Sequence, residues 1–170
     1  MRSFAIGSAG TMLLLACGML AGVAHASDDP EQARGAAAPA QIVASLDPRA
    51  RERALAQGLS SRLLVLVNQY RERNGLQPLR VADDLAALAA QHSAAMSARG
   101  RASHDGFMDR FDRAGSRICV ENVAVNFPHA EALLDGWRGS AEHHRNLLEP
   151  QVTRVGLASS KKYVTFFACG

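Results

Sequence analysis

The sequence predicts an α+β domain in which a small antiparallel sheet is covered by helices. From about residue 58 onward, four segments have apolar side chains at three- and four-residue spacing, as amphipathic helices do. Three short segments after residue 117 are rich in β-branched or aromatic residues and predict strands. Because these strands are few and close in sequence, antiparallel pairing under a cover of helices is the simplest packing.

The first predicted helix runs from about residue 59 to a stop signal at Asn74-Gly75. Its apolar positions are Leu59, Leu63, Leu66, Val67 and Tyr70. The second helix is expected to be capped by Asp83 or Asp84 and to end at Gly100. His92 lies on its apolar face, where a core histidine is a simpler interpretation than a ligand.

The remaining elements are shorter. A third helix is predicted from Phe107 to the stop at Gly115, followed by a strand over 118–125. Pro128 opens a fourth helix that includes Trp137, which is expected to be a core anchor. Two strands, over 152–159 and 163–168, are predicted to form a hairpin.

The first 26 residues are predicted to be a signal peptide. Arg2 precedes an apolar run, and Ala24-His25-Ala26 is a small-x-small site, so we expect cleavage after Ala26. Cys17 leaves lipoprotein processing open as an alternative, which Leu15 disfavours because it is bulky for such a site. The mature protein is therefore expected to be secreted or periplasmic, with no transmembrane anchor after processing.

The segment 27–57 consists mainly of small and polar residues and predicts a largely disordered linker, with a short helix around 48–56 as an alternative. The folded domain is predicted over 58–170. Removing Arg2 with the signal peptide lowers the Lys and Arg total from 19 to 18, against 16 Asp and Glu. With its Arg residues spread among acids, the chain is not expected to bind nucleic acid.

Two cysteines remain in the mature chain, Cys119 and Cys169. In an exported protein an even pair predicts one disulfide, whereas two separate thiols are the alternative. The bridge would join the segment that contains Glu121 to the last strand.

Three polar segments suggest a site. They are Ser103-His104, Glu121-Asn122-Val123-Ala124, and the stretch from Trp137 through Ser140 and His143 to Asn146-Leu147-Leu148. With Leu66-Val67-Asn68-Gln69-Tyr70-Arg71 and Gly75-Leu76-Gln77-Pro78-Leu79 before them, their order and spacing resemble the CAP superfamily. That group comprises cysteine-rich secretory, antigen five and pathogenesis-related proteins. The chain is most similar to its short bacterial, SCP-like extracellular members.

The resemblance implies a three-layer α-β-α sandwich with a central cleft. His104 and His143 match the two cavity histidines of the family, and Glu121 matches one cavity glutamate. Animal and plant members have a second glutamate where this chain has Ser140. The cleft or ligand-binding residues are therefore expected to be His104, Glu121, His143 and Ser140, and a four-ligand metal site is in doubt.

The residue types allow several chemistries. Two imidazoles and a carboxylate (His104, His143 and Glu121) could hold zinc or another divalent cation, and with an open position they would suit a metal-assisted, peptidase-like hydrolase. An HExxH motif is absent. Ser140 lies three residues before His143, as a nucleophile and its base could, but the pair lacks an elbow motif and an identifiable third member, so no catalytic residue is assigned. His104 and Glu121 could also be structural groups that bond to loop backbone.

We therefore expect the protein to be a monomeric binding or interaction module, and not an enzyme, with a cleft suited to a divalent cation. Its expected partner is an extracellular protein, a glycan or a lipid. Metal-assisted hydrolysis, and binding of a lipid or sterol, are the alternative functions.

Overall fold

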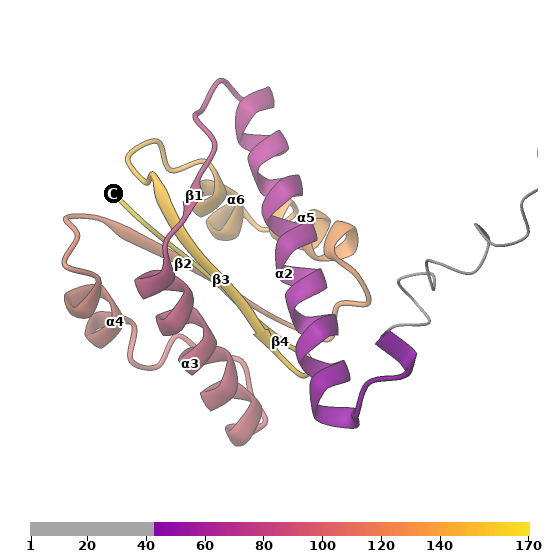
Figure 1. Ribbon diagram of the computed structural model, residues 1–170. Coiled ribbons are helices and arrows are strands. Elements are labelled where there is room, and N and C mark those ends of the chain that lie inside the picture. The colour runs from indigo at the N-terminus through magenta and orange to yellow at the C-terminus, as the bar shows by residue number, and fades with distance from the viewer. Residues whose placement is uncertain (1–42) are drawn as a thin grey trace, which may run out of the picture. The chain divides into compact units, whose positions relative to one another are not determined.

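The computed structural model describes residues 43–170. The predictions for the signal peptide, for Cys17 and for most of the linker fall outside these residues. Within them no helix is long and apolar enough to cross a membrane. The helices and strands follow one another as shown in Figure 1: α2 (Pro48–Arg73), β1 (Arg80–Val81), α3 (Asp83–Arg99), α4 (Phe107–Ala114), β2 (Cys119–Val125), α5 (Ala130–Arg138), α6 (Ala141–Leu147), β3 (Arg154–Ser160) and β4 (Tyr163–Cys169).

The strands form one mixed sheet in the order β1-β3-β4-β2. The predicted hairpin is confirmed: β3 pairs antiparallel with β4, and β2 also pairs antiparallel with β4. The expectation of a wholly antiparallel sheet is wrong in one respect, because β1 pairs in parallel with β3 at Arg154 and Val155. A strand of two residues is too short to show the period-2 pattern by which strands are found in a sequence.

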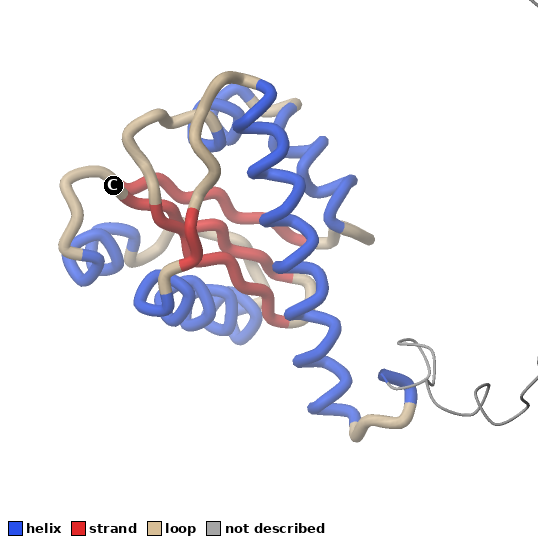
Figure 2. The backbone as a smooth tube through the Cα atoms, turned by 45° about the horizontal axis from the view of Figure 1, so that its top comes forward, coloured by secondary structure: helices blue, strands red, loops and turns tan. Residues whose placement is uncertain are grey.

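Helices cover both faces of the sheet (Figure 2). The central strand β4 is buried along its whole length, and its side chains alternate between the two layers. Phe166 packs against Trp137 of α5 on the face that α2 also covers, whereas Phe167 packs against Phe107 of α4 on the face that α3 covers. The expected α+β three-layer sandwich is confirmed, with five described helices where about four were predicted.

Two helix starts differ from the sequence prediction. The helix expected from about residue 59 begins at Pro48, so the helix allowed over 48–56 is its first part. Asp47 caps it, accepting from the backbone N–H of Arg49 and Ala50 at 3.0 Å each. In α3 the N-cap is Ala82, and Asp83 and Asp84 lie in the first turn, where their charge favours the helix dipole.

The disulfide is formed between Cys119 and Cys169. The two residues are directly opposite each other in the pairing of β2 with β4. The bridge therefore joins the strand that contains Glu121 to the last strand, as predicted.

Candidate functional site

The predicted site is built around Glu121, in the middle of β2. Its side chain is 1% exposed. In the antiparallel pairing Glu121 lies opposite Phe167, and directly opposed residues point to the same face of a sheet. Glu121 therefore faces the layer formed by α3 and α4.

Arg110 of α4 neutralises this buried carboxylate. Its Nε donates to Oε2 of Glu121 at 2.7 Å, and its Nη2 donates to Oε1 at 2.8 Å. A third N–H group, on Nη1, donates to the carbonyl of Asp105 at 2.9 Å. Such a two-pronged guanidinium–carboxylate pair is among the stronger ionic contacts in proteins, and it satisfies both carboxylate oxygens.

His104 completes the shell around Glu121 from the loop between α3 and α4. Its Nδ1 lies 2.8 Å from Oε1 of Glu121. Since a carboxylate only accepts, Nδ1 holds the proton and Nε2 is the free nitrogen. The side chain of His104 is 53% exposed, so it presents Nε2 to solvent.

His92 of α3 fixes the loop that contains Ser103 and His104. It is buried, and its Nε2 donates to the carbonyl of Ser103 at 2.8 Å. Burial lowers the pKa of His92, against the opposing effect of the charge on Glu121. The prediction of a core histidine is confirmed, and the structure adds that it holds the segment next to His104.

His143 approaches from the other layer. Asn122, the neighbour of Glu121 on β2, faces the opposite side of the strand and donates its amide N–H to the carbonyl of His143 at 3.0 Å. Asn146 fixes this amide by donating to its Oδ1 at 2.9 Å. Asn122 thus bonds backbone beside the cleft, as predicted. Glu121 and Asn122 thus reach opposite faces of β2, an edge strand, and the ring of His143 packs near Trp137. His143 and Ser140 are not among the residues that line the cavity beside Glu121.

His143 differs from an ordinary surface histidine in its electrostatics. The pKa of His143 is lowered chiefly by burial and next by the charge of His104. His143 is therefore a neutral imidazole near pH 7. Ser140 precedes α6 as its N-cap residue, and its hydroxyl makes no hydrogen bond within residues 43–170. Nothing described there pairs Ser140 with His143 as nucleophile and base.

A cavity of about 310 Å³ opens at this edge of β2. It is lined by His104, Phe107, Cys119, Val120, Glu121 and Asn146. Its lining offers one imidazole, one amide and an aromatic ring, and its only carboxylate is already paired. The cavity therefore combines an apolar wall with a few polar groups, which is typical of a small-ligand site.

The arrangement does not fit the tentative three-ligand metal site of His104, His143 and Glu121. In the part of the chain that the structure describes, no group of three or more His, Cys, Asp or Glu side chains is placed to hold a metal ion. The oxygens of Glu121 already accept from Arg110 and His104. Of the three proposed metal ligands, only the imidazoles of His104 and His143 remain.

Sequence reasoning missed one central residue of the site, Arg110. Arg110 stands three residues after Phe107 and one before Phe111, within the apolar face of a short helix. A charged residue at such a position indicates a buried partner of opposite charge. Asn146 was part of the third motif but was given no role of its own; it lines the cavity and donates to the carbonyl of Glu121 at 3.1 Å.

The remaining histidines of the described chain, and Trp137, have structural roles. His129 caps α5, and its Nδ1 accepts from the backbone N–H of Ala132 at 3.3 Å. The ring of His144 hydrogen-bonds to the hydroxyl of Tyr70 at 2.8 Å, away from the cleft. Trp137 is 1% exposed and is the predicted core anchor.

Most of the described chain matches a known protein family. The sequence profile described as CAP, cysteine-rich secretory protein family, matches residues 64–170. The chain belongs to the CAP family. The matched region contains every strand of the sheet and all the cleft residues discussed above.

Curated relatives come from Bacillus subtilis. The chain is 30% identical over 116 residues to the uncharacterized membrane protein YlbC, covering 61% of this chain and 32% of YlbC. It is 26% identical over 103 residues to the uncharacterized protein YkwD, covering 56% of this chain and 40% of YkwD. This CAP protein therefore matches less than half the length of either relative.

Solved structures agree in fold. An extracellular protein containing an SCP domain from Bacillus anthracis matches with a TM-score of 0.68 and 28% identity, over 73% of this chain and 44% of that one. A cysteine-rich secretory protein from Staphylococcus aureus matches with a TM-score of 0.62 and 21% identity, over 67% and 38% of the two chains. The second likeness shows the fold alone. The first likeness, together with the family match, confirms the bacterial, SCP-like type of CAP domain.

Proposed function

We propose that this CAP protein is an exported binding module that holds its partner through the cleft at the outer edge of β2. Support for export comes from the predicted signal peptide, from the disulfide of Cys119 with Cys169, and from the likeness to an extracellular Bacillus anthracis protein.

The observation that favours binding over metal-assisted hydrolysis is the state of Glu121. Arg110 engages both oxygens of this buried carboxylate. A buried carboxylate that is neutralised by a guanidinium and accepts three hydrogen bonds is a poor metal ligand and a weak general base, which disfavours both roles for Glu121. Its role is to orient His104, which presents Nε2 to the cavity side.

The cleft suits a ligand with one polar and one apolar part. His104 Nε2 accepts a hydrogen bond when neutral and donates one when protonated. Phe107 and Val120 form an apolar wall beside it. A peptide side chain, a glycan ring with its acetyl group, or the head region of a lipid has this combination.

The test is a protein-observed NMR screen of the mature chain against three probes: N-acetylglucosamine, N-acetyl-leucinamide and octanoate. We expect at least one probe to shift the backbone amides of residues 104–107 and 119–121, and the shifts to vanish in His104→Ala. Arg101→Ala, whose guanidinium lies outside the cavity lining, is the matched control and should keep them. Shifts that cluster elsewhere, or that persist in His104→Ala, would overturn the proposal.

A second measurement addresses metal chemistry directly. Zinc is titrated calorimetrically into the wild type, His104→Ala and His143→Ala. The proposal expects no tight one-to-one complex in the wild type. Stoichiometric binding lost in both variants, together with chelator-sensitive peptide hydrolysis, would establish the hydrolase instead.

A further inference from the structure

The strand β3 has a partner along only part of its outer edge. β1 pairs with it at Arg154 and Val155, and the chain then leaves the sheet to begin α3 at Asp83. From Gly156 to Ser160, β3 has β4 on one side and no strand on the other within residues 43–170. An open strand edge is a template to which another extended segment can add.

The backbone groups on this open edge belong to Leu157 and Ser159. The N–H of Ala82 donates to the carbonyl of Val155 at 3.0 Å, so the backbone groups of Val155 face β1. The N–H and C=O groups of successive residues alternate between the two edges of a strand. Those of Leu157 and Ser159 therefore point the same way as those of Val155, beyond the end of β1.

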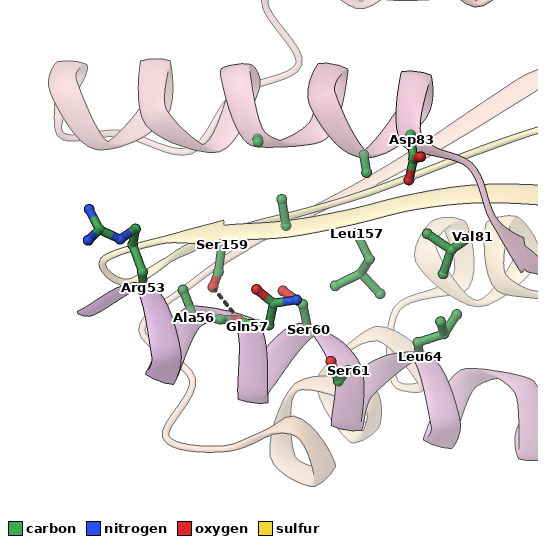
Figure 3. A pocket seen from close by; sticks show the side chains of 13 residues that line it. Arg53, Ala56, Gln57, Ser60, Ser61, Leu64, Val81, Asp83, Leu157 and Ser159 are labelled. Atoms are coloured by element: carbon green, nitrogen blue, oxygen red, sulfur yellow. Dashed lines mark hydrogen bonds between the residues drawn. The ribbon is translucent and has the colours of Figure 1, made fainter. Parts of the chain in front are cut away.

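A cavity of about 510 Å³ lies along this edge, between α2 and α3 (Figure 3). Leu157 and Ser159 form its floor and point toward α2. The α3 wall has the small residues Ala86 and Ala90, whereas the α2 wall combines small residues with larger ones. The α2 residues are Arg53, Ala56, Gln57, Ser60, Ser61 and Leu64. Leu157 and Ser159 are only partly buried, so the edge of β3 is not sealed by the two helices.

Polar groups inside the cavity lack partners or are already fixed. The Oγ of Ser60 is the one buried side-chain polar atom without a hydrogen-bond partner among the described residues, and Ser60 lines the cavity. A buried hydroxyl without a partner costs free energy, which a ligand carbonyl or amide would recover. Ser159 donates its hydroxyl to the carbonyl of Ala56 at 3.2 Å and ties the edge strand to α2.

The cavity has opposite charges at its two ends. Asp83 lies next to Val81, where β1 stops, and Arg53 lies near Ser159 at the far end (Figure 3). Neither Asp83 nor Arg53 forms an ion pair within the described part of the chain. A strand that continued the line of β1, parallel to β3, would start near the acid and end near the base.

We propose that this groove binds an extended peptide segment of a partner protein, which adds to the sheet as a strand parallel to β3. The peptide has a basic residue at its N-terminal end and an acidic residue at its C-terminal end, with small or medium side chains between them. Its main chain bonds to Leu157 and Ser159, and Ser60 supplies a further hydrogen bond. This groove is separate from the β2 cleft, and neither proposal depends on the other.

The test uses fluorescence anisotropy with the mature chain and a labelled hexapeptide, Lys-Val-Thr-Val-Thr-Glu. The control peptide, Glu-Val-Thr-Val-Thr-Lys, has the same composition with the end charges exchanged. We expect the first to bind about five- to tenfold more tightly than the second, because two exposed charge pairs reverse sign. Equal affinity for the two peptides would contradict the parallel orientation and overturn the proposal.

Backbone pairing is tested on the peptide, where no variant can misfold. One version is N-methylated at both Val residues and another at residues three and five, which are both Thr. A strand that pairs along one edge loses binding at least tenfold with one of these versions and stays within about twofold with the other. Equal loss with both versions, or with neither, would refute strand addition.

Protein variants then locate the groove. Arg53→Glu should weaken binding of the first peptide about fivefold or more and strengthen binding of the control peptide with exchanged charges. Arg51→Glu changes the net charge by the same amount at a residue outside the cavity lining, and it should change neither affinity. Sedimentation equilibrium of the mature chain is measured in parallel. A dimer that Arg53→Glu dissociates would identify a second copy as the occupant and overturn the peptide proposal.

Discussion

Replacing Arg110 with methionine tests whether the centre of the site is a true buried ion pair. The side chain of Glu121 is 1% exposed and that of Arg110 is 7% exposed. Removing one partner of such a pair leaves an uncompensated buried charge, which typically costs about 3–5 kcal/mol. Since a domain of this size has a free energy of unfolding of about 5–15 kcal/mol, the variant should still fold but be clearly less stable than the wild type.

The matched control is Arg113→Met, three residues along the same helix. Arg113 contacts Asp109 at 3.4 Å, and both side chains are about half exposed or more (49% and 69%). An exposed pair of this kind contributes about 0–1 kcal/mol. The double variant Arg110→Met/Glu121→Met should be more stable than Arg110→Met by about 1–3 kcal/mol, because the buried charge is gone.

The assay is urea unfolding at pH 7, followed by far-UV circular dichroism, with the midpoint and the slope compared for all four proteins. An unchanged slope with a lower midpoint shows a loss of stability without a change in the unfolded state. If Arg110→Met came within about 1 kcal/mol of Arg113→Met, or the double variant were no more stable than Arg110→Met, the charge of Glu121 would not depend on Arg110. The argument for an occupied carboxylate would then fail.

Three further outcomes are expected. Replacing both Cys119 and Cys169 with alanine should lower the free energy of unfolding by about 4 kcal/mol, because the bridge closes a loop with a sequence separation of 50 residues. The loss is measured by urea unfolding, and a loss below about 1 kcal/mol would contradict the prediction. Burial lowers the pKa values of His92 and His143 below the ordinary histidine value of about 6.5, so the unfolded chain binds more protons at acid pH. The free energy of unfolding should therefore fall as the pH drops below about 6.5, and less steeply in His92→Gln; a free energy of unfolding that is flat between pH 7.5 and 5.5 would refute this. Gly156→Ala should lower the free energy of unfolding by about 1–3 kcal/mol, because the new Cβ collides with the carbonyl of Leu85. Gly58→Ala, at a position in the middle of α2 where the new Cβ meets no atom, should raise it by about 0.5–1 kcal/mol. Both are measured by thermal unfolding, and equal effects at the two glycines would contradict the close approach of α3 to β3.

Local patterns were enough to predict most elements of the fold. The periodic apolar residues of α2 and α3 and the stop signals at Gly75 and Gly100 are local, and both glycines have the positive φ that ends a helix. The hairpin of β3 with β4 was found for the same reason. The parallel strand β1 was missed because it is held by hydrogen bonds to residues far away in sequence. The N–H of Arg80 donates to the carbonyl of Thr153, and the N–H of Ala82, just after the strand, donates to the carbonyl of Val155.

The site was predicted less completely than the fold. The motifs indicated His104 and Glu121, and the structure brings these two together at 2.8 Å. They also indicated His143, which approaches from the other layer. The register of β2 against β4 decides this difference, because side chains of a strand alternate between its faces and Glu121 and Asn122 point to opposite sides.

By itself the sequence determined the family resemblance, the main helices and strands, and the cysteine pair, since each is encoded in spacing along the chain. Only the tertiary structure decided that Arg110 takes up the carboxylate of Glu121 and that β3 is left with an open edge between α2 and α3. Both depend on contacts between segments whose approach is set by how the layers pack. No local periodicity records such an approach, because the free energy of burying a charge or leaving an edge unpaired exists only once the chain has folded.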